Sequence, residues 1–232
     1  MQYEEQFPNI LFYQKYLIQF MINPVIILGA KEIGLMALEI FVSNNIVVYC
    51  LLDEDTKEHQ KEYGDAVVMG SWDDEGFLKL IGKKCDAFVA VENLKERKFL
   101  AEMLEENRKV RPVNAIHRQA IISASAKLGD GNLINAGTII GTKANIANYV
   151  LIQNGVVVEA LAEVEDFVHV CSGAIIGQGA VIEQGAFIGS GAIVVPGVRV
   201  GKNARVGAGS LVAANVKSGK TVFGNPANEV SV

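Results

Sequence analysis

The most regular feature of the chain is an aliphatic residue at every sixth position through its second half. The series begins at Ile122 and ends at Val212, and all sixteen members are Ile, Leu or Val. Small residues such as Ala144, Ala162 and Ala180 recur four places after the aliphatic ones, and glycine often follows the aliphatic residue directly. An unbroken hexad repeat predicts a parallel β-helix with three short faces per coil, and this one is long enough for roughly five coils.

The first half of the chain alternates strands and helices instead. Short apolar runs bounded by proline, glycine or acidic residues predict buried strands, and segments with helical spacing separate them. The predicted strands are 25–29, 46–55 and 86–91, and the predicted helices are 35–45 and 93–107. Such alternation predicts a parallel sheet with right-handed crossovers. We therefore expect an α/β, Rossmann-like half domain over 24–115 and an all-β parallel β-helix over 116–232.

The N-terminal stretch 1–23 is apolar enough to be tested as a leader or a membrane span. Glu4 and Glu5 stand where a leader peptide has positive charge, and no small-residue cleavage site follows. Polar residues, among them Gln14 and Lys15, interrupt the apolar run, so no integral membrane segment is expected. We predict a helical extension that packs on this protein or a sister subunit. A membrane-surface helix is the weaker alternative, because a basic face is absent.

Composition and charge narrow the class of protein. Half of the 232 residues are hydrophobic and 20% are charged, which predicts a sizeable core. The net charge of −5 argues against a nucleic-acid-binding surface. Cys50, Cys85 and Cys171 are far apart in sequence and form no CxxC pair. Neither a disulfide framework nor a metal site is expected, and a cytoplasmic location fits.

The segment GAKEIG (29–34) follows the first predicted strand and begins a helix, where backbone N–H groups would meet a phosphate. Only Gly29 and Gly34 fit the dinucleotide pattern GxGxxG, and Lys31 replaces the glycine that admits a pyrophosphate. The α/β region is also only one mononucleotide half. NAD is therefore not expected.

The hexads, the preceding α/β half, the junction NAIHRQAIIS and the tail Gly-Asn-Pro-Ala (224–227) together resemble one family. It is the left-handed β-helix, hexapeptide-repeat nucleotide-sugar acetyltransferases of the bacillosamine and sialic acid branches. The resemblance covers roughly 24–230. It implies a left-handed β-helix and a homotrimer with acetyl-CoA between neighbouring subunits. It also implies acetylation of an amino or hydroxyl group on a nucleotide-linked sugar for surface glycan biosynthesis.

The segment around 150–170 resembles the family's catalytic stretch. The letters DFVH (166–169) match the family, which places His169 near the acetyl group, where it would stabilise an oxyanion. The histidine that serves the family as general base falls on Ala160. An acid precedes it here as in the family, and Glu163 is a second candidate base, although both acids also fit solvated coil positions. The predicted catalytic residues are His169, Glu159, Gln153 and Asn154.

Loss of the histidine bears on the type of acceptor. A positioned base contributes about 10²–10⁴-fold, while positioning alone is equivalent to ~7–11 kcal/mol. An amine is a far better nucleophile than an alcohol and can survive the loss. We therefore expect an acetyl-CoA-dependent N-acetyltransferase acting on a nucleotide-linked amino sugar, specifically a UDP-4-amino-4,6-dideoxy sugar. A non-catalytic homologue and a sugar O-acyltransferase are the alternatives.

The remaining site residues follow from the resemblance and from residue type. The predicted substrate-binding residues are Gly29, Lys31, Asp53, Glu54 and Asn93. The predicted acetyl-CoA-binding residues are Gly173, Ser190, Gly191, Ala208, Lys217 and Pro226. Of the other two histidines, we interpret His117 as structural and His59 as a surface residue. Departures from the family in the loop at 29–34 leave the nucleotide open.

Overall fold

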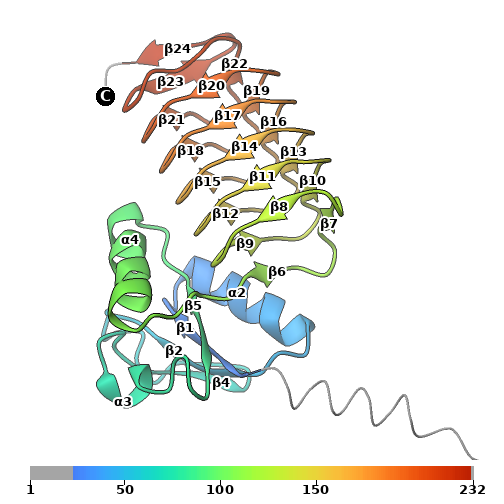
Figure 1. The fold of residues 1–232 in the computed structure, drawn as a ribbon. Coiled ribbons are helices and arrows are strands. Elements are labelled where there is room, and N and C mark those ends of the chain that lie inside the picture. The colour runs from blue at the N-terminus through green and yellow to red at the C-terminus, as the bar shows by residue number, and fades with distance from the viewer. Residues whose placement is uncertain (1–22, 231–232) are drawn as a thin grey trace, which may run out of the picture.

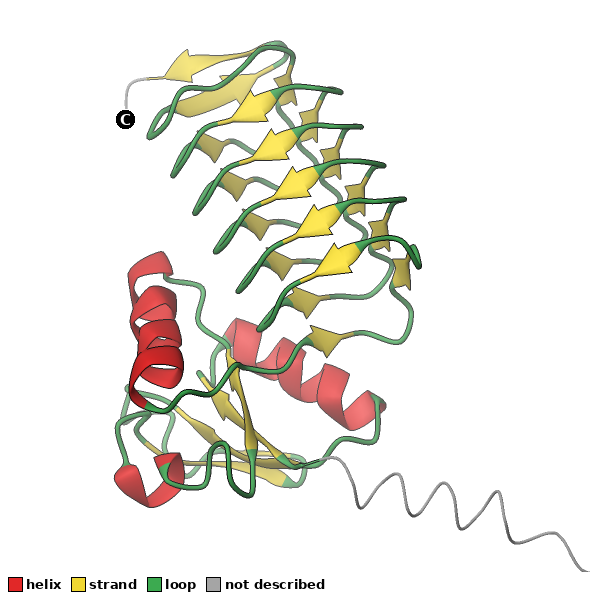
Figure 2. Ribbon diagram, viewed as in Figure 1, coloured by secondary structure: helices red, strands yellow, loops and turns green. Residues whose placement is uncertain are grey.

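A computed structural model of the chain describes residues 23–230 (Figure 1). Residues 1–22 of the predicted helical extension lie outside this range. A small α/β half sits at one end of a long three-sided β-helix, and the C-terminus lies at the far end of the β-helix (Figures 1 and 2). The fold class predicted from the hydrophobic pattern is confirmed.

The α/β half is built on a five-stranded sheet in the order β3-β4-β2-β1-β5. All neighbours are parallel except the β3–β4 pair. The strands are β1 (Val25–Leu28), β2 (Val48–Leu52), β3 (Glu62–Tyr63), β4 (Ala66–Gly70) and β5 (Asp86–Val89). The helices are α2 (Glu32–Ser43), α3 (Glu75–Leu78) and α4 (Leu94–Glu102), and α4 continues into a π-helical turn, η1 (Met103–Asn107). Helix α2 lies between the sheet and the first coils, and α4 runs beside the β-helix (Figure 1).

The β-helix has three parallel faces, each named here by its first strand. The β6 face contains β6 (Ala115–Ile116), β9 (Leu133–Ile134), β12 (Leu151–Ile152), β15 (His169–Val170), β18 (Phe187–Ile188), β21 (Arg205–Val206), β23 (Thr221–Gly224) and the antiparallel β24 (Ala227–Val230). The β7 face contains β7 (Ile121–Ile122), β10 (Ile139–Ile140), β13 (Val157–Val158), β16 (Ile175–Ile176), β19 (Ile193–Val194) and β22 (Leu211–Val212). The β8 face contains β8 (Lys127–Leu128), β11 (Asn145–Ile146), β14 (Glu163–Val164), β17 (Val181–Ile182) and β20 (Arg199–Val200).

The hexad positions form the core of the β-helix. Each is the second residue of a two-residue strand, and all except Ile122 and Leu128 in the first coil are buried. Many residues two places before a hexad position are small, and several of these, such as Ala162 and Ala180, are fully buried at the corners. Because each strand pairs with the strand one coil later, an outward residue such as His169 is flanked by Leu151 and Phe187. The predicted repeat is therefore confirmed residue by residue.

The α/β elements differ from the predicted ones in length and number. Strand β2 stops at Leu52, because the following Asp53 turns its carboxylate toward the β1–α2 loop. The predicted helix over 93–107 changes to a π-helical turn at Met103. The segment between β2 and β5, for which the hydrophobic pattern gave no assignment, contains β3, β4 and α3. Within the described range, no helix is long and apolar enough to span a membrane.

Candidate active site

A cavity of about 400 Å³ opens at the carboxyl ends of β1, β2 and β5. Ligands of open α/β sheets bind at this edge. The lining residues are Gly29, Lys31, Glu32, Ile33, Asp53, Trp72, Ala90, Val91, Glu92, Asn93 and Glu96. Four of the five predicted substrate-binding residues are thus brought together. The fifth, Glu54, is exposed and does not line the cavity.

Two glycines allow the floor of the cavity to form. A Cβ on Gly29, whose φ is +120°, would lie 2.4 Å from the carbonyl oxygen of Ala90. A Cβ on Gly34 would lie 2.1 Å from the carbonyl oxygen of Gly29. The start of α2 therefore packs directly on the strand ends, and its first residues, Glu32 and Ile33, line the cavity. The N-terminus of a helix is suited to binding an anion. These close approaches explain why both positions are glycine.

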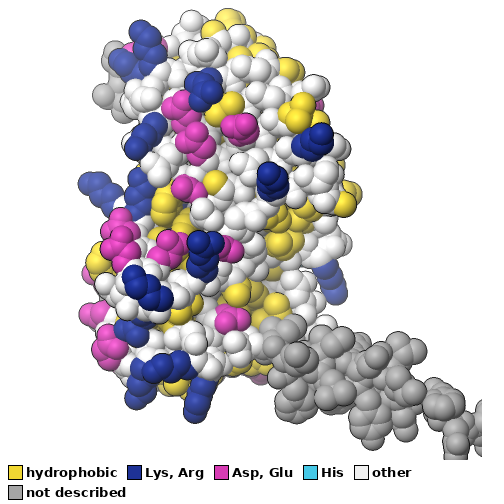
Figure 3. All heavy atoms as spheres, viewed as in Figure 1, with side chains coloured by type: hydrophobic (Ala, Val, Ile, Leu, Met, Phe, Trp, Pro, Cys, Tyr) yellow, Lys and Arg dark blue, Asp and Glu magenta, His cyan; other side chains and the backbone are white. Residues whose placement is uncertain are grey.

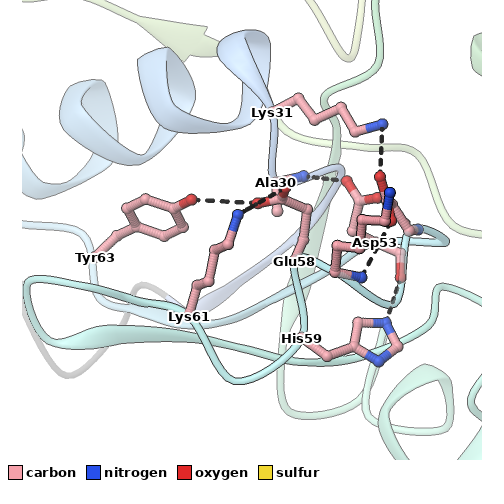
Figure 4. Close-up of polar contacts among 9 residues, drawn as sticks. Ala30, Lys31, Asp53, Glu58, His59, Lys61 and Tyr63 are labelled. Carbon is pink, nitrogen blue, oxygen red and sulfur yellow. Dashed lines mark hydrogen bonds and ion pairs between the residues drawn. The ribbon is translucent and has the colours of Figure 1, made fainter.

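Asp53 holds the loop rather than pointing freely into the cavity (Figure 4). It is buried, and its carboxylate accepts hydrogen bonds from the backbone N–H of Ala30 (2.7 Å) and of Asp55 (2.9 Å). Its carbonyl oxygen lies 2.8 Å from Nε2 of His59, which is half-buried beside the loop. Lys31 is the only cation among the lining residues in the described part, and its ammonium is 3.5 Å from Asp55. Lys31 is therefore placed to meet a phosphate.

His169 lies on the β6 face in a packed environment. It is 4% exposed, and its ring meets the Phe187 ring edge-on at 5.3 Å. The guanidinium of Arg205 in turn covers Phe187 at 4.4 Å. Burial first, and then the positive charges of Arg97 and Arg205, lower the pKa of His169 to about 4. The ring is therefore neutral at physiological pH.

The neighbours of His169 determine which ring nitrogen holds the proton. Ser172 donates its hydroxyl to Oε1 of Gln153 at 3.3 Å, and Nε2 of Gln153 lies 3.0 Å from Nε2 of His169. An amide nitrogen can only donate, so Nε2 of His169 accepts and the ring proton is on Nδ1. Nδ1 faces Oε1 of Glu92 at 3.7 Å. His169 therefore has one N–H donor, on Nδ1, and this donor faces Glu92, which lines the cavity.

Cys171 is the remaining reactive side chain near this histidine. Its sulfur lies 3.8 Å from Nε2 of His169. Burial raises the pKa of the Cys171 thiol to about 11, so the thiolate needed for a nucleophile is not present at neutral pH. The pair is a packing contact and not a cysteine–histidine dyad.

One buried arginine joins the cavity to the coil of His169. Arg97 of α4 donates from Nη1 to the carbonyl oxygens of Val91 (3.2 Å) and Glu92 (3.1 Å). It donates from Nη2 to the carbonyl oxygen of Phe167 at 2.7 Å. The cavity-lining loop after β5 is thus fixed against the β-helix, two residues before His169.

The predicted acetyl-CoA residues Gly173, Ser190, Gly191 and Ala208 stack on one edge of the β-helix, which follows the β6-face strands. Each coil hydrogen-bonds to the one below, with Gly173 N–H donating to Asn154 and Gly191 N–H to Ser172. A Cβ on Gly173 or Gly191 would meet nothing within 4 Å, so the space beside this edge is open. The edge starts at Gln153 and Asn154, next to His169, and rises toward the C-terminal strands.

The other predicted residues lie apart from this group. Glu159 follows β13 on the β7 face, and its carboxylate accepts a 2.7 Å hydrogen bond from the backbone N–H of Gln178 in the next coil. Lys217 precedes the C-terminal β23–β24 hairpin, whose turn contains Pro226. Lys217 and Pro226 are exposed and lie several coils beyond His169. His117 accepts a hydrogen bond from the backbone N–H of Gln119, a local structural contact.

Sequence reasoning missed three residues of the site: Trp72, Glu92 and Arg97. Glu92 could have been found, since it follows a predicted parallel strand, and ligands bind at the carboxyl ends of such strands. Arg97 looked like one more charge on an amphipathic helix. Nothing in the local pattern marked it or Trp72 as part of the site.

Comparisons with known proteins agree with this geometry. The family described as bacterial transferase hexapeptide (six repeats) matches residues 179–214. No curated protein matches the chain at a significant level. A histidine-to-alanine mutant of GDP-perosamine N-acetyl transferase from Caulobacter crescentus, solved with CoA and GDP-perosamine, has a TM-score of 0.83 and 27% identity. The match covers 91% of this chain and 98% of that chain.

Two further structures share the fold at lower identity. WeeI from Acinetobacter baumannii AYE has a TM-score of 0.76 at 22% identity, over 89% of this chain and 99% of that one. The acetyltransferase domain of PglB from Neisseria gonorrhoeae FA1090, in complex with acetyl coenzyme A, has a TM-score of 0.66 at 21% identity, over 90% and 100%. The predicted resemblance to acyltransferases of the hexapeptide-repeat, left-handed β-helix type is confirmed. The chain's α/β half followed by a β-helix is the architecture of the sugar acetyltransferases among them.

Proposed function

We propose that the protein transfers an acetyl group from acetyl-CoA to the amino group of a nucleotide-linked amino sugar. The observation that supports this most is the distance of 3.7 Å between Glu92, which lines the α/β cavity, and Nδ1 of His169 on the β-helix. A nucleotide held in the cavity would extend its sugar past Glu92 to the histidine. One substrate would then use both halves of the chain.

The acyl donor would lie along the open edge of the β-helix. Gly173 and Gly191 leave room for an extended chain beside the backbone, and the edge ends next to Gln153 and His169. The thioester would thus reach the histidine from the edge while the sugar reaches it from the cavity. The exposed Lys217 at the far end is suited to a phosphate of the coenzyme.

His169 would act as a donor and not as a base. Its pKa of about 4 makes it a poor proton acceptor, and Gln153 already donates to its Nε2. The N–H on Nδ1 can stabilise the oxygen of the thioester carbonyl as negative charge develops there. This donor role suits an amine acceptor, which needs less activation than an alcohol.

The sugar would be a 4-amino-4,6-dideoxy sugar. We predicted a UDP carrier from the family resemblance, whereas the Caulobacter relative was solved with GDP-perosamine. The ammonium of Lys31 and the backbone N–H groups at the start of α2 would hold the diphosphate, which is the same in either nucleotide. The choice of nucleotide base would then be made deeper in the cavity, near Trp72.

A homotrimer would complete this assembly. The outward residues of the β7 face form an aliphatic stripe, whereas those of the β8 face include charged and amide side chains. The stripe consists of Ile121, Ile139, Val157, Ile175, Ile193 and Leu211. Hydrophobic side chains are visible along the right-hand side of the β-helix in Figure 3, where Figure 1 places the later strands of this face. A contiguous apolar face of this kind marks a protein interface.

A thiol-release assay tests the function. Acetyl-CoA is supplied with GDP-, UDP- and dTDP-linked 4-amino sugars, each paired with its 4-hydroxy counterpart. Release of CoA with one amino sugar, and none with its hydroxyl partner, supports the proposal. Turnover of the hydroxyl sugar would indicate an O-acyltransferase. Absence of turnover across the panel would favour a non-catalytic homologue.

A further inference from the structure

Glu92 lines the α/β cavity and also lies beside His169 of the β-helix. Its carboxylate lines the cavity, and Oε1 is 3.7 Å from Nδ1 of His169. The side chain is 60% exposed, so it is open to a ligand in the cavity. It follows β5, and its backbone carbonyl is fixed by Arg97. The carboxylate is therefore accessible to a substrate, while its backbone is held.

The other acid–base groups near the acyl site are already occupied. Nε2 of His169 accepts from Gln153, and its remaining nitrogen bears a proton. The carboxylate of Glu159 accepts from Gln178 N–H and lies on a different face of the β-helix. Cys171 is a buried neutral thiol. Among the described residues around His169, Glu92 is the carboxylate that faces the cavity.

We propose that Glu92 is the general base of the acetyl transfer. It would take the role of the family's histidine, which is replaced by Ala160 in this chain. This inference rests on the proposed function. The sugar amine attacks the thioester carbon, so that a C–N bond forms while the carbonyl oxygen gains negative charge beside Nδ1–H of His169. The nitrogen then loses a proton to Glu92. The C–S bond breaks, and the proton passes from Glu92 to the leaving sulfur, which yields the amide and free CoA thiol.

The position of Glu92 also fits an amine acceptor in particular. A carboxylate next to the cavity attracts an ammonium and is paired with a neutral histidine rather than an imidazolium. The nucleophile and the oxyanion donor would thus be oriented by adjacent groups on one side of the thioester. Such orientation accounts for a large part of the rate in reactions that need only a modest base.

The test compares Glu92→Gln and Glu92→Ala with the wild type, using acetyl-CoA and the amino sugar of the panel that the wild type acetylates. We expect kcat to fall by about 10²–10⁴-fold in both variants. Formate is small enough to occupy the space vacated in Glu92→Ala and should restore kcat by about tenfold or more. Glu39→Gln, which removes an exposed carboxylate from the outer side of α2, should match the wild type.

Binding is measured separately from chemistry. Trp72 is the only tryptophan of the chain and lines the cavity, so its fluorescence reports binding of GDP or UDP. Both Glu92 variants should bind the nucleotide as tightly as the wild type. Two results would overturn the assignment of Glu92 as the base without affecting the proposed function. One is a kcat of Glu92→Gln within about threefold of the wild type, and the other is a loss of kcat in Glu92→Ala that formate does not restore. Failure of the wild type with every sugar would overturn the proposed function and this inference together.

Discussion

Arg97 of α4 donates a 2.7 Å hydrogen bond to the carbonyl oxygen of Phe167 on the β-helix. The same guanidinium holds the carbonyl oxygens of Val91 and Glu92 in the cavity loop. The side chain is only 2% exposed, and its Nε has no partner among the described residues. A buried cation is costly unless it is well hydrogen-bonded. The contacts of Arg97 form a joint between the α/β half and the β-helix, and this joint depends on the guanidinium keeping its hydrogen bonds.

Replacement of Arg97 by Met tests the joint. The variant keeps much of the side-chain volume but leaves three carbonyl oxygens without their donor, so we expect a loss of about 1–3 kcal/mol in the free energy of unfolding. Lys95→Met on the exposed side of the same helix should be close to neutral. Urea unfolding measures both. A variant Arg97→Met with the wild-type midpoint would show that the joint contributes nothing.

The stability of the protein should depend on the protonation of His169. Its pKa is about 4 in the folded state and about 6.5 in the unfolded state, so the unfolded state binds the extra proton between these values. Stability from this group is present above about pH 6.5 and is lost as the pH falls, by about 2 kcal/mol between pH 7 and pH 5. We expect His169→Gln to remove this part of the pH dependence. Equal slopes of unfolding free energy against pH in both proteins would contradict it.

The close approach at Gly29 should be intolerant of a side chain. Gly29→Ala combines a φ of +120° with a 2.4 Å contact to the Ala90 carbonyl. Gly64→Ala is the matched control, because Gly64 also has positive φ but has nothing within 4 Å of the added Cβ. We expect the control to lose about 1 kcal/mol and Gly29→Ala at least about 2 kcal/mol more. Thermal unfolding and Trp72 fluorescence with GDP would record both effects.

The aliphatic stripe of the β7 face predicts the oligomeric state. Ile193→Glu places a charge in the stripe and should shift the protein from a trimer toward the 25.0 kDa monomer. Lys127→Glu changes the charge on the β8 face and should leave the trimer intact. Analytical ultracentrifugation distinguishes the two. A wild-type protein that is monomeric at all concentrations would refute the trimer.

The β-helix could be predicted in detail because its contacts repeat. Every hexad residue meets the residue one coil later, so the local pattern fixes the register as well as the fold. The same repeat places Gly173 and Gly191, two of the predicted acetyl-CoA-binding residues, on one edge of the β-helix. It also explains why Glu159, which directly follows β13, lies on another face than His169. Proximity along the chain is a poor guide where successive hexads turn a corner.

The contact between Glu92 and His169 could not be predicted in this way. It joins residues from two halves with different periods, and it depends on how α4 docks against the coil of Phe167. The side chain that fixes this docking, Arg97, has no sequence pattern that separates it from neighbouring surface charges. The way the α/β half docks on the β-helix depends on a few long-range contacts, whereas the individual strands and helices are determined by the local sequence.

The most direct measurement is a crystal structure of the protein with CoA and the accepted nucleotide-linked amino sugar. We predict the nucleotide in the cavity beside Trp72 and the sugar amine within about 2.6–3.2 Å of the Glu92 carboxylate, or one water away. The sulfur of CoA should lie at the end of the open edge, next to His169. A sugar amine directed away from Glu92, or a nucleotide bound outside the cavity, would contradict the proposal that both halves act on one substrate.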